Sequence, residues 1–216
     1  MRTVLYLWFW AGAVMGLGAA ETESPTGTFP TAISSGGAGI WEAGVGEGFL
    51  RTARSFSLEA GGGIGVRAFG GKQRHDLALA SLSYGHVLGP VLGEDRWWRG
   101  NVECRLELFS GAQFSPGSEG LVGLAPHLRY DFATGTRWVP FIDAGAGVTA
   151  TSIGTPDLSN IFEFNLQGGA GLHRFLREDL ALTIEARYLH LSCAGISRPN
   201  NGLNTVMGMV GLTWFF

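Results

Sequence analysis

Apolar and polar side chains alternate along most of the chain that follows residue 55. Within residues 120–133, one parity carries Leu124 and Leu128, and the other carries His127 and Arg129. Because successive side chains of a β-strand point to opposite faces of its sheet, this alternation predicts strands that are apolar on one face and polar on the other. The pattern predicts strands over residues 56–69, 75–88, 99–113, 120–133, 137–150, 162–175, 179–193 and 204–216. The alternation is clear in several of these segments, and the parity of the second is ambiguous.

Segments of about ten residues with one apolar and one polar face are typical of outer-membrane barrels. The sequence therefore predicts an all-β fold, an eight-stranded antiparallel transmembrane β-barrel of the outer membrane. The alternative is a secreted soluble barrel or sandwich, whose apolar face would form the core. The last segment favours the membrane barrel, because its alternation up to a terminal aromatic residue resembles the signal that outer-membrane insertion machinery recognises; it carries Val210, Leu212, Trp214 and Phe216.

Residues 1–20 have the three parts of a secretory signal peptide. Arg2 supplies the positive start, residues 4–17 form an apolar run, and Gly18-Ala19-Ala20 provides a cleavage site of small residues. An uncleaved membrane anchor is the alternative, but the run is short for a spanning helix, which needs about 20 residues. After cleavage of this peptide, the protein is expected in the outer membrane of a Gram-negative bacterium.

The rest of the chain divides into an amino-terminal segment, residues 21–55, and the barrel, residues 56–216. Residues 21–38 are rich in Ser, Thr, Gly and Pro and are predicted to be poorly ordered. Residues 40–49 fit either an extra strand or a stretch tucked against the barrel, and the sequence leaves both open.

Composition agrees with a barrel and excludes nucleic acid as a partner. The chain has 35 Gly, 12% aromatic and 15% charged residues, with a net charge of −3. Glycines inside alternating segments favour curved strands over helices, and the sequence has no basic patch of the kind that nucleic acid requires. Cys104 and Cys193 are predicted to be free thiols, because their strand positions lie beyond the ~7 Å that a disulfide allows between Cα atoms.

An even number of strands places both ends of such a barrel at the periplasm and the longer loops outside. This orientation gathers an interfacial aromatic belt at the periplasmic end, formed by Trp97, Trp98, Trp138 and Trp214. Side chains fill the lumen of a barrel of this size, so we predict an interior polar network of Glu59, Arg67, Glu103, Arg105, Glu107, Arg129, Asp143, Glu185 and Arg187. The other four histidines lack the close spacing of metal ligands and are predicted to lie in loops or in the barrel interior: His75, His86, His127 and His173.

A histidine and a serine fall on the apolar parity near the end of the seventh segment. Every second residue from Leu180 to Tyr188 is apolar, and His190 and Ser192 continue that parity. A Ser hydroxyl becomes a nucleophile when a base lies within hydrogen-bond reach, and a third polar group usually orients the base. Asn204 has the outward parity of the next segment and can approach His190 across the hairpin. The alternative is that all three are merely interfacial polar residues.

The stretch YLHLSCAGISRPNNGLNT, residues 188–205, with the apolar strand that ends the chain, resembles the lipid A 3-O-deacylase family (PagL-like, often labelled acyloxyacyl hydrolase). Elsewhere the resemblance rests on the strand pattern and on phrases such as FATGTRWVPFIDAGAG. Members of that family are eight-stranded outer-membrane barrels with a lipid-facing His–Ser–acid site near the outer surface. The resemblance implies no cofactor, His190 as base, Ser192 as nucleophile, and an oxyanion region around Cys193, Ala194 and Gly195.

Two positions depart from the family pattern. Cys193 stands where the family usually has Asn, and Asn204 stands where characterised members have a Glu that orients the His. The resemblance implies an ester hydrolase that removes an ester-linked acyl chain from lipid A, with Asn204 holding the imidazole. The alternative, which the departures favour, is a catalytically impaired structural or lipopolysaccharide-binding barrel; a small porin is a third hypothesis. The sequence leaves open whether the barrel forms a homodimer.

Overall fold

The structure is a computed structural model that describes residues 39–159 and 161–216. The predicted signal peptide, residues 1–20, and residues 21–38 of the predicted amino-terminal segment lie outside the described residues. Within the described part of the chain, no helix is long and apolar enough to cross a membrane. The named elements there are all β-strands.

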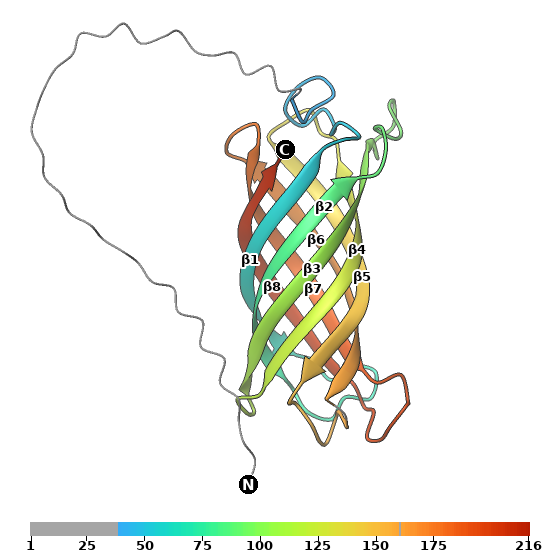
Figure 1. Ribbon diagram of the computed structural model, residues 1–216, viewed down its shortest axis with the longest axis vertical. Coiled ribbons are helices and arrows are strands. Elements are labelled where there is room, and N and C mark those ends of the chain that lie inside the picture. The colour runs from blue at the N-terminus through green and yellow to red at the C-terminus, as the bar shows by residue number, and fades with distance from the viewer. Residues whose placement is uncertain (1–38, 160) are drawn as a thin grey trace, which may run out of the picture. The chain divides into compact units, whose positions relative to one another are not determined.

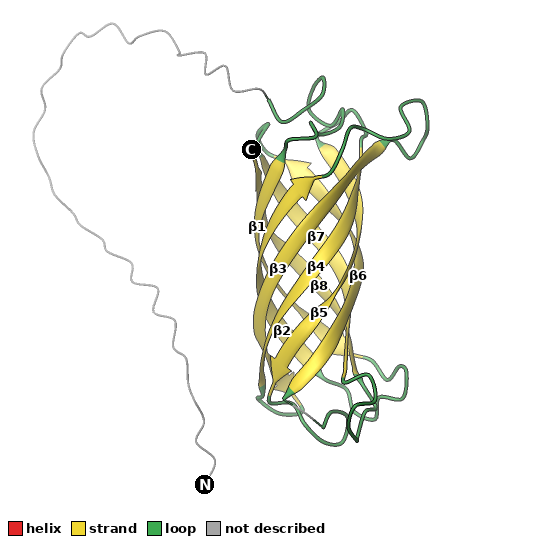
Figure 2. Ribbon diagram, turned by 45° about the vertical axis from the view of Figure 1, so that its right-hand side comes forward, coloured by secondary structure: helices red, strands yellow, loops and turns green. Residues whose placement is uncertain are grey.

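Eight antiparallel strands close into a barrel, in which each strand pairs with its chain neighbours and the first pairs with the last (Figure 1, Figure 2). They are β1 (Arg54–Gly65), β2 (Asp76–Val87), β3 (Gly100–Ser115), β4 (Gly120–Phe132), β5 (Trp138–Thr151), β6 (Phe162–Phe175), β7 (Leu180–Ser192) and β8 (Leu203–Phe215). The predicted fold class is confirmed. The predicted bounds differ most at β1, which ends at Gly65 because the chain leaves the wall there for the β1–β2 loop.

The alternation of the sequence becomes the two surfaces of the barrel wall. In β7, Thr183 and Glu185 are buried in the lumen, whereas Ile184 is 52% exposed on the outside. The parity of β2 is also decided, since Leu77 faces inward and Leu82 outward. Lipid therefore meets an apolar outer wall, as the alternation predicts.

Charged side chains fill the middle of the lumen, where each buried arginine is paired with carboxylates, as a buried cation requires. Arg129 lies between Asp143 at 3.1 Å and Glu185 at 3.2 Å, and Arg187 contacts Glu107 at 2.7 Å. The predicted interior positions are confirmed for Glu59, Glu103, Arg105, Glu107, Arg129, Asp143, Glu185 and Arg187. The prediction was wrong for Arg67, which is exposed in the β1–β2 loop because β1 ends before it.

The histidines and cysteines follow the same inward and outward alternation. His127 and His173 are buried in the lumen, and His75 is buried at its end. The prediction was wrong for His86, which shares the outward parity of β2 and is exposed. Both cysteines are free thiols: Cys104 is exposed on the outer wall, and Cys193 is buried where the chain leaves β7.

Apolar side chains close the lumen near the end where the site residues lie, which we call the outer end. This end carries the β1–β2 loop (66–75), the β3–β4 loop (116–119), the β5–β6 connection (described for 152–159 and 161) and the β7–β8 loop (193–202). Leu158 of the β5–β6 connection is fully buried and joins a cluster with Leu77, Leu79, Phe109, Leu121, Ile153, Leu189, Leu191, Leu203, Met207 and Met209. The cluster separates the charged lumen from the outer loops.

Residues 39–53 form a strap across the opposite end of the barrel (Figure 1). Its Phe49 stacks on Phe215 with ring centroids 4.8 Å apart, and Trp41 stacks on Phe49 at 4.6 Å. Trp41 and Phe49 make only an isolated bridge, so residues 40–49 tuck against the barrel and do not add a strand. The predicted tryptophan belt lies at this same end, in the β2–β3 loop and at the ends of β5 and β8.

Candidate active site

The outer end of the β7–β8 hairpin brings two of the predicted site residues into contact on the outer wall. Strand register sets His190 opposite Asn204 and sets Ser192 opposite Phe164 of β6. His190 and Ser192 are half-buried on the outward parity of β7. Directly opposed residues of antiparallel strands have Cβ atoms about 4.5–5.5 Å apart, so register alone brings the histidine and the amide within reach.

Asn204 is held by three polar partners. Its Oδ1 accepts a hydrogen bond from the Tyr188 hydroxyl at 2.5 Å and contacts His190 Nδ1 at 2.7 Å. Its Nδ2 donates to the Ala68 carbonyl, in the β1–β2 loop, at 2.8 Å. The side chain is only 2% exposed. A buried amide with partners at both ends has little freedom to turn.

These contacts assign the tautomer of His190. A carbonyl oxygen such as that of Ala68 can only accept, so the amide must present Nδ2 to Ala68 and Oδ1 to His190. The imidazole must then carry its proton on Nδ1 and donate it to Asn204. Nε2 is left with a free lone pair, which is the form that a general base requires.

Two neighbouring loops shape the space around the imidazole. The Phe69 ring meets the His190 ring edge-on, with centroids 6.0 Å apart, and is itself 81% exposed. Gly202 has a φ of +78°, and a Cβ added there would lie 2.8 Å from Cε1 of His190. Glycine is therefore required at 202 both for its left-handed backbone and for the room it leaves to the ring.

Ser192 lies two residues beyond His190 on the same face of β7. Among the described residues, no hydrogen bond joins its Oγ to His190. The pair of His190 and Asn204 is thus preassembled, while the contact between base and hydroxyl is not. Catalytic hydrogen bonds are often long in structures without substrate, so this geometry is compatible with a nucleophile that engages its base when an acyl group binds.

The predicted oxyanion region is a tight turn directly after Ser192. The N–H of Cys193 donates to Oδ1 of Asn200 at 3.0 Å, and its thiol donates to the Ser197 carbonyl at 3.4 Å. Ala194 and Gly195 have positive φ angles of 53° and 81°. The Cys193 amide is therefore already engaged within the β7–β8 loop, whereas Ala194 and Gly195 are exposed.

An apolar surface pocket of about 500 Å³ lies beside Ser192, lined by Ser159, Ile161, Phe162, Phe164, Cys193 and Ile196. Phe164 is the cross-strand partner of Ser192 and Cys193 follows Ser192 in the chain, so two direct neighbours of the serine line the pocket. It combines residues of β6 with residues of two outer loops.

A comparison with known protein families identifies the barrel. The sequence profile of the lipid A 3-O-deacylase (PagL) family matches residues 80–213, which include His190, Ser192 and Asn204. The chain belongs to the lipid A 3-O-deacylase (PagL) family. The resemblance seen in the sequence is thereby confirmed.

Individual proteins with the same family name are similar to this lipid A 3-O-deacylase family member. Lipid A deacylase PagL of Pseudomonas aeruginosa is 31% identical over 119 residues, which are 50% of this chain and 65% of that protein. The match thus spans just under two thirds of the relative's length. The crystal structure of the outer membrane enzyme PagL has a TM-score of 0.53 at 22% identity, over 72% of this chain and 97% of that one.

Neisserial surface protein A has the same fold, with a TM-score of 0.56 at 13% identity, over 76% of this chain and 99% of that one. At such identities the two solved structures show the shared fold alone. Fold and family together place the protein in the outer membrane of a Gram-negative bacterium.

Sequence reasoning missed the residues that surround the pair of His190 and Asn204 in this family member. Tyr188 could have been found, because it shares the parity of His190 and lies two residues before it. Ala68 and Phe69 could not, because they come from a loop more than a hundred residues away in the chain and contribute a backbone carbonyl and an exposed ring.

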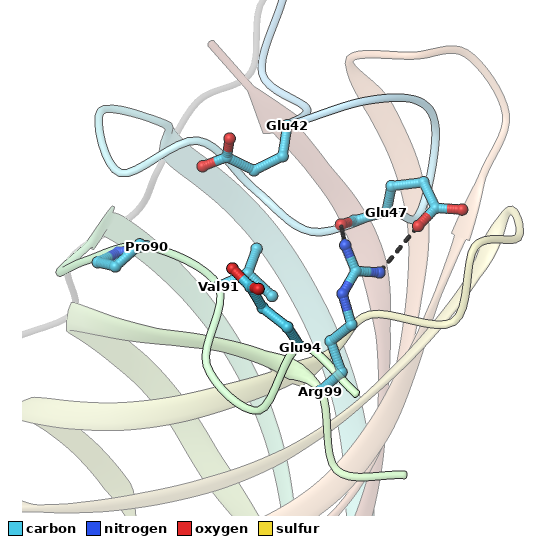
Figure 3. Close-up of a pocket in the computed structure, with 6 residues that line it drawn as sticks. All are labelled: Glu42, Glu47, Pro90, Val91, Glu94 and Arg99. Carbon is cyan, nitrogen blue, oxygen red and sulfur yellow. Dashed lines mark hydrogen bonds and ion pairs between the residues drawn. The ribbon is translucent and has the colours of Figure 1, made fainter. Parts of the chain in front are cut away.

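Another pocket lies at the opposite end of the barrel and is separate from this site. Its volume is about 530 Å³, and it is lined by Glu42, Glu47, Pro90, Val91, Glu94 and Arg99 (Figure 3). Arg99 pairs with Glu47 at 2.8 Å and so ties the β2–β3 loop to the strap (Figure 3). The residues that could carry chemistry on a lipid are at the other end.

Proposed function

We propose that this barrel is an ester hydrolase that removes an ester-linked acyl chain from lipid A, with Ser192 as nucleophile and His190 as base. The observation that supports this proposal is the contact of His190 Nδ1 with Asn204 Oδ1 at 2.7 Å on the outer wall. It leaves Nε2 free as a base on the same strand face as Ser192.

In the proposed reaction, Nε2 of His190 takes the proton of Ser192 Oγ while Oγ attacks the acyl carbonyl carbon. The ester bond to the sugar then breaks, and the imidazolium returns the proton to the leaving sugar oxygen. Water, deprotonated by His190, then attacks the acyl-Ser192 ester, the bond between Oγ and the acyl carbon breaks, and the imidazolium returns the proton to Oγ as the fatty acid leaves. Because Asn204 is uncharged, it orients the imidazole but offsets less of its positive charge than a carboxylate would.

The tetrahedral oxyanion needs donors preorganised next to Ser192. The Cys193 N–H is engaged with Asn200 and the Gly195 backbone hydrogen-bonds the Cys193 thiol, so in this proposal the role falls to the exposed backbone N–H of Ala194. The apolar pocket lined by Phe162, Phe164 and Ile196 would receive the acyl chain, since its volume is in the range of small-ligand sites.

Charge at the outer end suits a phosphorylated glycolipid. The exposed charged side chains of the described outer loops are all cationic: Arg67, Lys72, Arg74 and Arg198. Acidic residues in these loops are buried or half-buried, as Asp157 and Glu119 are. Cationic loops above a lipid-facing site attract anionic head groups, and the attraction falls as salt rises.

The second candidate is a barrel that kept the scaffold and binds lipopolysaccharide without cleaving it. It is favoured first by the lack of a hydrogen bond between Ser192 and His190 among the described residues. The uncharged Asn204 points the same way.

Mass spectrometry of lipid A from expressing cells separates the two candidates. We expect wild type and Ser110→Ala to remove one ester-linked acyl chain from lipid A. In Ser192→Ala the rate of deacylation should fall by on the order of 10³-fold or more. Ser110 is a matched control, because it also faces outward, on β3. If wild type and Ser192→Ala give identical lipid A while both migrate as folded barrels in electrophoresis, the hydrolase proposal fails and the second candidate stands.

A further inference from the structure

The β5–β6 connection contributes a buried carboxylate for which the proposed reaction has no role. Asp157 is fully buried. It accepts hydrogen bonds from the backbone N–H groups of Lys72 and Gln73 at 2.7 and 2.8 Å and contacts Nε2 of His75 at 2.9 Å. All three partners belong to the β1–β2 loop. Since a buried carboxylate is tolerated only with such compensation, this contact fixes the second half of that loop.

The first half of the same loop touches the site. The Ala68 carbonyl accepts from Gly71 N–H at 3.0 Å and from Asn204 Nδ2 at 2.8 Å. Residues 68–71 therefore form a turn with Asn204 on its carbonyl, and the next two residues are those anchored by Asp157. The position of that carbonyl thus depends on where Asp157 holds the chain.

The segment around Asp157 also holds the loop on the other side of the imidazole. Asn201 donates its backbone N–H to the Asp157 carbonyl at 2.9 Å and its Nδ2 to the Pro156 carbonyl at 2.7 Å. Gly202, which makes room for the His190 ring, follows directly. One short stretch of the β5–β6 connection therefore binds both loops that flank the pair of His190 and Asn204.

We propose that Asp157 is a positioning residue of the lipid-facing site, which acts through the turn at residues 68–71 and its Ala68 carbonyl to orient Asn204. Without that carbonyl as acceptor, the amide of Asn204 is free to turn Nδ2 toward His190. His190 would then hold its proton on Nε2 and lose the lone pair that the base needs. The catalytic consequence rests on the proposed function, whereas the orientation of Asn204 does not.

The anchor needs an ionised Asp157 carboxylate as acceptor and therefore depends on pH. Burial raises the pKa of Asp157, but the N–H groups of Lys72 and Gln73 and the His75 ring lower it more, so the pKa lies below the usual Asp range. The other groups facing this cluster are Gln113 of β3, which contacts His75 Nδ1 at 2.5 Å, and Glu119, which accepts from Gln113. Because the folded pKa is the lower one, the anchor holds above about pH 4 and is lost as pH falls further.

The test compares Asp157→Asn with wild type in the full-length barrel refolded in lipopolysaccharide-containing vesicles. The Asn side chain fits the space but turns an N–H₂ group toward donors of the β1–β2 loop. We expect kcat for fatty acid release to fall about 10-fold or more, with KM within about 2-fold, because misplaced catalytic groups slow the reacting step. Amide exchange at Lys72 and Gln73 should accelerate, and the ¹⁵N resonances of the His190 ring should shift toward the other tautomer.

Asp179→Asn is the matched control, because Asp179 is also a hydrogen-bonded carboxylate of a loop, 2.9 Å from Arg177, but is exposed in the turn at the opposite end. It should leave kcat, loop exchange and the His190 resonances unchanged. A wild-type kcat and wild-type His190 resonances in folded Asp157→Asn would overturn the proposal, even if loop exchange rose. If wild type releases no fatty acid, the proposed function fails, and the His190 resonances and loop exchange still decide whether Asp157 positions the site.

Discussion

At the scale of single residues, the site depends on the orientation of one amide. When Asn replaces the Asp of a serine protease triad, the wrong imidazole tautomer costs about 10⁴ in kcat. Here the Ala68 carbonyl takes Nδ2 of Asn204, so Oδ1 faces His190. The amide therefore selects the productive tautomer, although it cannot stabilise an imidazolium as a carboxylate does. We infer a slow hydrolase rather than an inactive one.

A graded pair of substitutions tests this role of Asn204. Asn204→Leu removes the partner of His190 Nδ1, and we expect kcat to fall by about 10²-fold or more. Tyr188→Phe removes one hydrogen bond to Oδ1 and leaves the amide in place, so the loss should be about 3–10-fold, the kinetic equivalent of one neutral hydrogen bond. Rates of fatty acid release in refolded vesicles measure both. Equal rates for wild type and Asn204→Leu would contradict an orienting role.

At the scale of elements, the barrel closes where β1 meets β8. At this seam a Cβ on Gly61 would lie 1.9 Å from the Gly208 carbonyl oxygen, whereas a Cβ on Gly208 would meet nothing within 4 Å. The two glycines are almost opposite one another in the register, yet only one is required by close approach. The pairing of β1 with β8 therefore requires a glycine at residue 61, and the alternation of apolar residues does not predict this requirement.

Alanine at these two glycines should have opposite effects on stability. We expect Gly61→Ala to lower the free energy of unfolding by about 1–3 kcal/mol, as overpacking does. Gly208→Ala, the control, should change it by less than about 1 kcal/mol and with either sign. Urea unfolding in lipid vesicles, followed by tryptophan fluorescence, measures the difference. A Gly61→Ala barrel as stable as Gly208→Ala would show that the seam relaxes around the added methyl group.

At the scale of the whole barrel, stability depends on arginine–carboxylate pairs in a lumen closed by apolar side chains at both ends. Arg129 is fully buried, lies 3.7 Å above the ring centroid of Phe141 and bridges Asp143 and Glu185. Removing one partner of a buried ion pair leaves an uncompensated charge, which costs more than the pair itself contributes. This arrangement favours a rigid scaffold over a water-filled channel.

Arg129→Met should therefore destabilise the barrel strongly while leaving the outer wall unchanged. We expect a loss of about 3–5 kcal/mol in the free energy of unfolding. Arg177→Met, which breaks the exposed pair with Asp179, should cost less than about 1 kcal/mol. The same urea titrations in vesicles compare them. Similar losses for the two variants would mean that the lumen rearranges or hydrates around the unpaired carboxylates.

The sequence by itself determined the strands, the parity of all but the second, and the wall that carries the candidate site residues. A period of two is a local property of the chain, and a strand translates it directly into inward and outward faces. His190, Ser192 and Asn204 could therefore be placed on the lipid side, and Cys104 and Cys193 kept apart, without any contact being known. The errors at Arg67 and His86 arose where a strand ended early or an outward position carried a polar ring.

Only the tertiary structure decided how the site is held. Asn204 and Ala68 are 136 residues apart in the chain, and Asp157 and Lys72 are 85 apart. Loops have no periodic pattern from which such contacts could be predicted. A backbone carbonyl is present in every residue type, so the sequence does not show which one accepts a hydrogen bond. The strap could also be placed only by its packing on Phe215. Strand faces follow from local alternation, whereas loop contacts depend on where the closed barrel brings distant segments together.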